Sequence, residues 1–416
     1  MGTTGIRSAP EGSMESDLKA RLDALDSHSL RRRLRELGSG QGPEVALGAH
    51  NLRNFSSNDY LGLANEPFLR EAAKEAIDRY GVGSGASRLV CGNLPPHQRL
   101  EEALARWKGC EAALSFSSGY AAAVGAVTAL VGAGDVVLLD KWCHASLIDG
   151  ARLSGAVLRV FPHNHLGRLE KLLDWASQKH SEGRVLIVTE AVFSMDGDRC
   201  ALAEMVKLKE RFGAWLLLDE AHSAGLLGRY GRGLADAEGV ASRVEVQMGT
   251  LSKALGGSGG YLCGSRALMD WVLNKARSFV YSTAPAPCVA AVGAAAVQWM
   301  ESAEAEKRRL TLWSRVDQLV RRLPQSFQSP QSAILPLILG EADRALGASD
   351  ALLSAGFLVP AIRYPTVPRG AARLRITLSA AHSAEAVDQL TDALASLAVD
   401  APEREVGIIG KVAEDR

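Results

Sequence analysis

Between residues 97 and 300, short apolar runs alternate with longer segments of mixed polarity. Apolar runs bounded by turn residues are typical of strands buried on both faces of a parallel sheet, and the longer segments suit helices. We therefore predict an α/β fold with a mostly parallel sheet wrapped by helices. The predicted strands are Ala112–Phe116, Val136–Asp140, Val157–Phe161, Val185–Glu190, Ala214–Asp219, Val244–Met248 and Gly260–Cys263.

The pattern differs on either side of this region. Leucines at helical spacing predict an amphipathic helix over residues 17–38, and a second helix is expected at about 67–80. After residue 300 a charged helix (301–323) and a Pro/Ser/Gln-rich link (324–332) precede a smaller α+β domain. Its strands are predicted near Ile334–Leu339, Leu358–Ile362 and Arg373–Leu378, and its helices near 342–355 and 384–397.

These patterns divide the chain into five parts. We predict a disordered N-terminus (1–16), an N-terminal helical arm (17–53), a large domain (54–300), a C-terminal small domain (301–400) and a tail (401–416).

Composition narrows the class of protein. The 416 residues include 47 basic and 47 acidic side chains, so the balanced charge gives no reason to expect nucleic acid or an anionic membrane as partner. Six cysteines without a C-x-x-C pair suit a reduced, cytoplasmic protein. Two charge-free stretches, 112–134 and 279–300, are interrupted by Ser, Gly or Pro and predict buried elements rather than membrane spans.

A lysine follows one of the predicted strands. Lys253 comes after Thr250 and Ser252 and before a glycine-rich turn at 256–260. A lysine just past a buried strand can lie in a partly desolvated cleft, where burial disfavours the ammonium form and leaves a nucleophilic amine. Taken alone, a solvated lysine is the commoner case.

An acidic motif upstream favours the buried, reactive lysine over the solvated one. Asp219 ends a predicted strand and is followed by Glu220, Ala221 and His222. Open α/β sheets bind ligands at the carboxyl ends of their strands. A lysine that forms a Schiff base and a carboxylate that keeps a ring nitrogen protonated are the two groups that pyridoxal phosphate (PLP) requires. A metal site at Asp219, Glu220 and His222 would need further ligands, and none is evident.

Other candidates follow neighbouring strands. The turn Ser117–Tyr120 precedes a predicted helix, whose N-terminal amides could bind phosphate, although many strand–helix turns look alike. His144 follows the next strand. Arg363, Arg373 and Arg375 lie on or beside the C-terminal strands, and one of them is a candidate for binding a carboxylate.

These residues resemble the motifs of the α-oxoamine synthase family of pyridoxal-phosphate enzymes over about residues 17–400. The motifs that carry the resemblance are Phe55–Leu63, Gly83–Arg88, Thr189–Asp198, Asp219–His222, Thr250–Lys253 and Tyr364–His382. The resemblance implies a fold-type I PLP-dependent transferase that forms a homodimer with its active sites at the subunit interface.

The resemblance also implies roles for individual residues. Lys253 would carry the Schiff base, Asp219 would pair with the ring nitrogen, and His144 would stack on the ring. Either His144 or His222 could act as an acid near the thioester carbonyl, and the sequence leaves that choice open. His222 and Ser194 would lie near the ring hydroxyl. The other expected cofactor contacts are Gly119, Tyr120, Glu190 (also near the substrate), Thr250, Ser252 and, from the other subunit, Thr283.

The implied reaction is a decarboxylative condensation of L-alanine with a pimeloyl thioester of CoA or of an acyl carrier protein. Arg363 would hold the amino-acid carboxylate, and Arg31 and Thr366 would meet the far carboxylate of the acyl group. Family members that use glycine are the alternative. A non-catalytic binding protein is disfavoured because the lysine, the aspartate and the histidines are all present.

Overall fold

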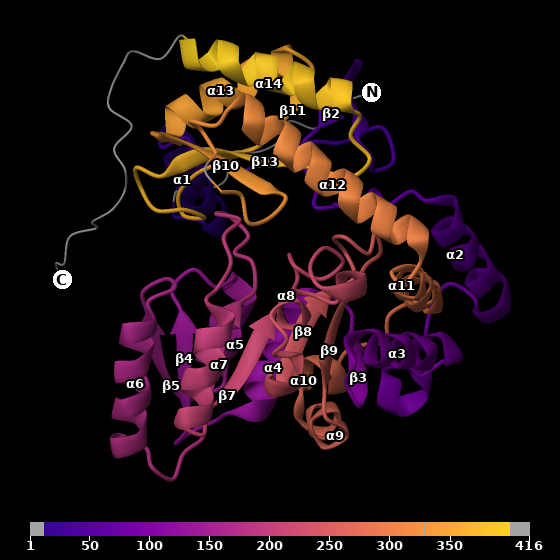
Figure 1. Cartoon of the computed structure of the whole chain (residues 1–416), viewed down its shortest axis with the longest axis vertical. Coiled ribbons are helices and arrows are strands. Elements are labelled where there is room, and N and C mark those ends of the chain that lie inside the picture. The colour runs from indigo at the N-terminus through magenta and orange to yellow at the C-terminus, as the bar shows by residue number, and fades with distance from the viewer. Residues whose placement is uncertain (1–11, 328, 400–416) are drawn as a thin grey trace.

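A seven-stranded sheet forms the centre of the larger part of the molecule. The computed structural model describes residues 12–327 and 329–399, and its strands lie in the order β3-β9-β8-β7-β6-β4-β5 (Figure 1). Only β9 runs antiparallel to its neighbours, β3 and β8, within this sheet. The strands are β3 (Ala112–Phe116), β4 (Val136–Asp140), β5 (Val157–Phe161), β6 (Val185–Glu190), β7 (Trp215–Asp219), β8 (Val246–Thr250) and β9 (Gly260–Gly264).

All seven predicted strands are therefore confirmed, with shifts of one or two residues at some ends. Strand β8 begins at Val246 rather than Val244 and continues to Thr250. The extension matters because it places Lys253 only three residues beyond the end of a buried strand.

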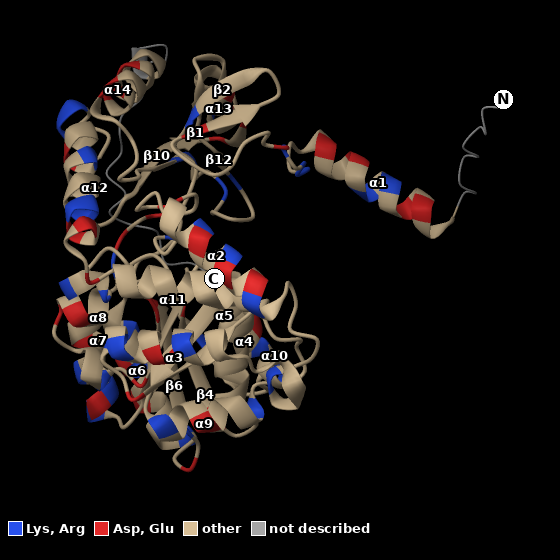
Figure 2. Ribbon diagram, turned by 90° about the vertical axis from the view of Figure 1, so that its right-hand side faces the viewer, with Lys and Arg blue, Asp and Glu red and all other residues tan. Residues whose placement is uncertain are grey.

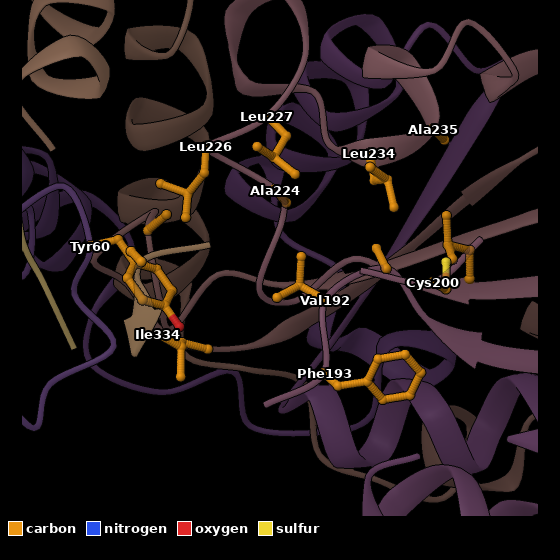
Figure 3. Packing of buried hydrophobic residues seen from close by; sticks show 14 of the residues in the cluster. Tyr60, Val192, Phe193, Cys200, Ala224, Leu226, Leu227, Leu234, Ala235 and Ile334 are labelled. Atoms are coloured by element: carbon orange, nitrogen blue, oxygen red, sulfur yellow. The ribbon is translucent and has the colours of Figure 1, made fainter. Parts of the chain in front are cut away.

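Alternate side chains of the strands pack on opposite faces of the sheet. On β6, Val188 packs with residues of α4 (Gly119–Leu130), α5 (Ala145–Leu153) and α9 (Arg266–Lys275). Its neighbour Ile187 packs with the cluster that includes α6 (Leu166–Lys179) and α7 (Leu202–Arg211). Figure 3 shows part of this second cluster, including Tyr60, Ile334 and, from the loop after β6, Val192 and Phe193. The remaining helices of this part are α2 (Pro67–Tyr80), α3 (Pro95–Lys108), α8 (Leu234–Ala237), α10 (Arg277–Val280) and α11 (Pro287–Trp299).

Two small sheets make up the upper part in Figure 1. One joins β10 (Ile334–Gly340), β13 (Ala372–Thr377) and β12 (Ala361–Ile362), all antiparallel. The other joins β1 (Glu44–Leu47), β2 (His50–Asn54) and β11 (Phe357–Leu358). Three helices, α12 (Ala303–Arg322), α13 (Ala342–Ser354) and α14 (Ala384–Val399), complete it.

The prediction of one strand over Leu358–Ile362 was wrong. The segment is divided between the two small sheets, with Pro360 at the break. Proline has no N–H to donate to a ladder, so the strand cannot continue through it. Strands β1 and β2 were not predicted, and β2 pairs in parallel with β11. Residues of the expected arm thus share a sheet with residues of the expected small domain, and the domain boundaries stay a prediction.

The predicted helix over 17–38 was also wrong in its extent. Helix α1 covers Met14–Ser27, capped by the Ser13 side chain. It ends where Ser29 adopts a left-handed φ of 54°, with Leu30 N–H bonded to the Leu25 carbonyl. None of its residues is buried, and it stands away from the rest of the chain (Figure 2).

Residues 14–16 are therefore helical rather than disordered. The rest of the terminal predictions, for residues 1–11 and 401–416, lie outside the described residues. Across residues 12–327 and 329–399, no helix is long and apolar enough to cross a membrane.

Candidate active site

A cavity of about 180 Å³ opens at the carboxyl ends of the parallel strands. Glu190 and Asp219 are the last residues of β6 and β7 and lie opposite each other in the sheet register. The side chains or backbone that line the cavity are Gly119, Tyr120, His144, Ser146, Glu190, Asp219, Ala221, His222, Met248, Thr250, Ser252 and Lys253. Nine of the residues predicted from sequence for the cofactor or for catalysis therefore come together here (Lys253, Asp219, His222, His144, Glu190, Gly119, Tyr120, Thr250 and Ser252).

The Lys253 amine is held in a buried chain of hydrogen bonds. Its Nζ is 2.7 Å from His222 Nε2, and His222 Nδ1 is 2.6 Å from the Tyr60 hydroxyl. Burial lowers the pKa of Lys253 to about 8, although the charges of Asp219 and Glu190 act in the opposite direction.

His222 stays uncharged in this chain. Burial, reinforced by the charge of Lys253, lowers the pKa of His222 well below its usual value, and burial raises the pKa of Tyr60 to about 12. A neutral imidazole carries one hydrogen on its two nitrogens. When the Lys253 ammonium donates to Nε2, the Nδ1–H donates to Tyr60; when Lys253 is an amine, both bonds can reverse. The two hydrogen bonds of His222 can therefore change direction when Lys253 gains or loses its proton.

The two carboxylates at the strand ends share one environment. Burial and the nearby Asp219 raise the pKa of Glu190 to about 8, and burial raises the pKa of Asp219 while Lys253 lowers it. Glu190 accepts the backbone N–H of His144. Among the described residues the Asp219 carboxylate accepts one hydrogen bond, from the Ala221 N–H to Oδ1 at 2.9 Å. Its second oxygen is available to a cationic group in the cavity, such as a protonated ring nitrogen.

Another set of residues in the cavity lining suits a phosphate. Helix α4 begins at Gly119, and Ser118 caps it by accepting the Ala121 N–H at 3.1 Å. The first amides of a helix have no intrahelical acceptor and favour an anion. The Thr250 and Ser252 hydroxyls lie 2.7 Å apart at the end of β8, on the same cavity. The residues present thus fit PLP, with a lysine, a carboxylate and a phosphate cradle around one space.

His144 forms a wall of the same cavity. It caps α5, and its Nδ1 is 2.8 Å from the Ser146 hydroxyl. Burial lowers the pKa of His144, which favours a neutral ring in the lining of the cavity that Lys253 and Asp219 share. No group of three or more His, Cys, Asp or Glu side chains suited to a metal ion occurs in the described part of the chain.

Comparison with known proteins gives the family. The model of the family described as aminotransferase class I and II matches residues 50–394. The chain belongs to this family. A protein named 8-amino-7-oxononanoate synthase, from Anaeromyxobacter sp. (strain K), is 48% identical to it over 387 residues, which are 93% of this chain and 96% of that relative. The expected membership of the α-oxoamine synthases within this PLP-dependent family is confirmed.

Two solved structures have the same fold as this family member. The serine palmitoyltransferase of Sphingomonas wittichii superposes with a TM-score of 0.87 at 32% identity, covering 94% of this chain and 98% of its own. A high-resolution structure of SPT with a PLP internal aldimine gives a TM-score of 0.87 at 28% identity, covering 93% of this chain and 100% of its own. The predicted fold-type I class is thereby confirmed.

Two predicted cofactor residues of this family member lie outside the cavity lining. Ser194 uses its carbonyl to accept a hydrogen bond from Arg375 Nε at 2.7 Å. Thr283 is exposed and forms an isolated antiparallel bridge with Ser87. Its expected contact, from one subunit to the cofactor of the other, stays a prediction.

Two of the three predicted substrate residues line a second pocket, of about 270 Å³. Arg363 and Thr366 lie there beside Arg32, whose Nη2 is 3.3 Å from the Thr366 hydroxyl. Arg31, which was expected at this position, instead pairs with Asp26 at 2.6 Å. The helix on which that expectation rested ends at Ser27, so the following residues do not keep helical spacing.

Sequence reasoning gave no role to the buried Tyr60, and it left the buried Arg375 as one of three candidate arginines for a carboxylate. Tyr60 belongs to the Lys253–His222 chain, and Arg375 is 5% exposed on β13. Arg375 donates to Asn58 Oδ1 at 3.1 Å, and its charge contributes to lowering the pKa of both Lys253 and His222. The sequence signal was an arginine in an otherwise apolar strand, but Arg373 gives the same signal.

Proposed function

We propose that this chain is a PLP-dependent acyltransferase that condenses L-alanine with a pimeloyl thioester. The reaction releases carbon dioxide and the thiol carrier and gives 8-amino-7-oxononanoate, a precursor in biotin biosynthesis. The proposed PLP chemistry rests on one observation, which is that the buried Lys253 amine shares a cavity with Asp219 and Glu190. The choice of substrates rests on the 48% identical relative of that name.

The cofactor would be held by the residues of the cavity. Lys253 would bind its aldehyde carbon, Asp219 its ring nitrogen, and the α4 N-terminus with Thr250 and Ser252 its phosphate. When bound, PLP supplies a protonated ring that withdraws electrons from the Cα of the amino acid. His144 would cover the ring face in this arrangement.

Proton transfer falls to Lys253 in this proposal. A pKa of about 8 leaves a useful fraction of neutral amine near neutral pH, which a solvated lysine does not have. The amine can take the Cα proton of alanine, while the Tyr60–His222 pair adjusts its hydrogen bonds to the ammonium that forms. His222 is held between Tyr60 and Lys253, so of the two histidines we assign the acid near the thioester carbonyl to His144.

We assign the alanine carboxylate to Arg375 in preference to Arg363. Arg375 is buried, and it joins through Asn58 to Tyr60, whose hydroxyl is 3.4 Å from Asn58 Oδ1. Neither arginine lines the Lys253 cavity itself, but Arg363 lies in the second pocket. Arg375 instead connects through Asn58 and Tyr60 to His222, which does line the Lys253 cavity. A guanidinium has five N–H donors, so Arg375 can hold its three protein partners and still donate to a carboxylate.

The second pocket is our candidate for the far carboxylate of the pimeloyl chain. A carboxylate there could be met by Arg32 and Thr366, with Arg31 and Arg363 adjoining. We further propose a cytoplasmic homodimer in which Thr283 reaches the cofactor phosphate of the partner. Full activity of a protein shown to be monomeric at assay concentration would contradict the dimer.

The test is a substrate matrix with identification of the product by mass. Pimeloyl, succinyl, acetyl and palmitoyl thioesters are each offered with alanine, glycine and serine. We expect one productive pair, pimeloyl with alanine. The palmitoyl–serine arm is included because serine palmitoyltransferase shares this fold, and turnover in that arm or with glycine would replace the proposal.

A further inference from the structure

His163 lies outside the Lys253 cavity, between two carboxylates. Its Nδ1 is 3.1 Å from Asp140 Oδ1, and its Nε2 is 2.7 Å from Asp198 Oδ2. Burial disfavours the charged ring, but the hydrogen bonds and charges of both carboxylates outweigh burial and raise the pKa of His163 to about 9. An imidazolium donates from both nitrogens, so His163 joins the end of β4 to the loop that follows β6.

Two aromatic rings fix the orientation of His163. Trp142 stacks on it with 4.0 Å between centroids and 16° between planes, and Phe193 meets it edge-on at 4.3 Å. Trp142 also donates its backbone N–H to Asp140 at 2.9 Å. The side chain of His163 is only 14% exposed. A ring held on both edges and on its face has one orientation, so both of its hydrogen bonds are fixed.

Two arginines of β13 donate hydrogen bonds to the loop from Phe193 to Asp198. Arg375 donates from Nε to the Ser194 carbonyl at 2.7 Å. Arg373 donates to Asp196 Oδ1 at 2.5 Å. The loop therefore supplies one of the three acceptors that position the Arg375 guanidinium, beside Thr377 and Asn58.

The contacts of this loop leave it little freedom to absorb a displacement on the His163 side. Gly197 packs so closely on β10 that an added Cβ would lie 2.3 Å from the Ile334 carbonyl oxygen. On the His163 side, Asn164 Nδ2 donates to Asp198 Oδ2 at 3.2 Å and to the Arg199 carbonyl at 3.0 Å. A loop wedged between the two parts of the molecule transmits a displacement on one side to the other.

We propose that His163 is a positioning residue that holds the loop from Phe193 to Asp198 and, through it, the Arg375 guanidinium for the substrate amino acid. The inference rests on the proposed function, in which Arg375 binds the amino-acid carboxylate. It predicts that loss of His163 weakens amino-acid binding and leaves the acyl thioester site unchanged, because that site lies at Arg32 and Thr366.

Two variants and one control test this. His163→Phe keeps an aromatic ring for Trp142 and Phe193 but removes both donors, and His163→Gln keeps an amide donor. The control is His165→Asn, because His165 is exposed and only caps α6, which Asn also does. The dissociation constant of L-alanine is measured by visible absorbance titration of the PLP-loaded enzyme, beside the KM of the acyl thioester and the melting temperature.

We expect His163→Phe to bind alanine about tenfold more weakly, the order expected for loss of one charge-assisted hydrogen bond. His163→Gln should lie between this variant and wild type, and His165→Asn should match wild type. An unchanged alanine constant in both His163 variants overturns the proposal. Equal losses in alanine affinity, thioester KM and cofactor retention also overturn it, because they indicate a general structural role.

A second measurement separates this proposal from the proposed function. Amide hydrogen exchange over residues 193–198 should be faster in His163→Phe than in wild type or His165→Asn, and unchanged exchange overturns the role of His163. If wild-type enzyme gives no absorbance change with alanine, the proposed function fails, and the exchange result alone then decides whether His163 holds the loop.

Discussion

The two regions of this chain that could bind carboxylates hold their arginines differently. Arg375 is 5% exposed and donates to the Ser194 carbonyl, the Thr377 hydroxyl and Asn58. Arg32 lies in an exposed segment after α1, and among the described residues its one side-chain hydrogen bond goes to Thr366 at 3.3 Å.

The difference concerns the entropy of binding. A guanidinium fixed by three acceptors loses no rotamer freedom when a carboxylate arrives, whereas an exposed arginine must be ordered by its ligand. The buried region thus suits a small carboxylate held in one geometry, which is the role that we propose for Arg375. The exposed region suits the end of a longer chain, where position is less strict.

The largest expected effect comes from the buried region. Lys253→Ala should lower turnover by roughly a thousandfold or more, because the base and the cofactor attachment are lost together. Borohydride should attach PLP to Lys253 in wild-type protein, as read by peptide mass. Lys141→Ala, an exposed lysine after β4, is the control. Label on another lysine would show that Lys253 does not bind the cofactor and would contradict the proposed role of the buried region.

Exchange of arginine for lysine sharpens the comparison between Arg375 and Arg363. Arg375→Lys should raise the alanine dissociation constant by roughly ten- to a hundredfold, since ammonium cannot reproduce the fork of donors. Arg363→Lys should change it by less than about twofold because Arg363 lies in the second pocket. Absorbance titration of both loaded variants measures the difference, and the reverse order would return the carboxylate to Arg363.

The exposed region should show a smaller, selective effect. Arg32→Ala should lower kcat/KM for the pimeloyl thioester about tenfold relative to a neutral acyl thioester of equal length. Arg31→Ala should cost less, because Asp26 already engages that guanidinium. The ratio of kcat/KM between the two thioesters, measured for each variant, is the test. Equal losses for both thioesters would remove the second pocket from substrate recognition.

The smallest effect is a shift in pH dependence. Only the neutral amine of Lys253 can capture PLP, and its fraction rises with pH through a pKa of about 8. The rate of PLP capture by cofactor-free protein should therefore rise with pH and reach half its maximum near pH 8. In Asp219→Asn the midpoint should move lower, because the Asp219 charge raises the pKa of Lys253. Stopped-flow absorbance measures both, and a midpoint near the ordinary 10.5 would contradict burial of the amine.

Much of the fold could be predicted because its strands are buried on both faces. Such strands appear in a sequence as apolar runs, and β3, β4 and β6 were predicted at their observed bounds. The bounds of the half-exposed edge strand β5 were predicted as well. The end of α1 was missed because the leucine spacing continues to Leu37, while the chain turns at Ser29, where no glycine marks a left-handed residue. Strands β1 and β2 are short, and their pairing depends on residues far along the chain.

Some residues of the candidate site could likewise be predicted from the sequence, and others could not. Lys253, Asp219 and His144 could be predicted together because each follows or ends a strand of one sheet, and strand ends meet at one edge. Glu190 was expected only from the family resemblance. Arg375 could not be distinguished from its neighbours, because its role depends on Asn58 and on the loop after β6, which only the folded chain brings to it.

The parallel pairing of β2 with β11 has a consequence for synthesis on the ribosome. Arg53 pairs with Phe357, so one edge of β2 has no partner until about 300 more residues have been made. At about 5–20 residues per second this takes roughly 15 to 60 seconds. The seven-stranded sheet, which lies between Ala112 and Gly264, is fully synthesised before then. The nascent chain therefore has an unpaired edge of β2 while all strands of the seven-stranded sheet are already synthesised. Chaperones that cover exposed strand edges can bind it during this interval.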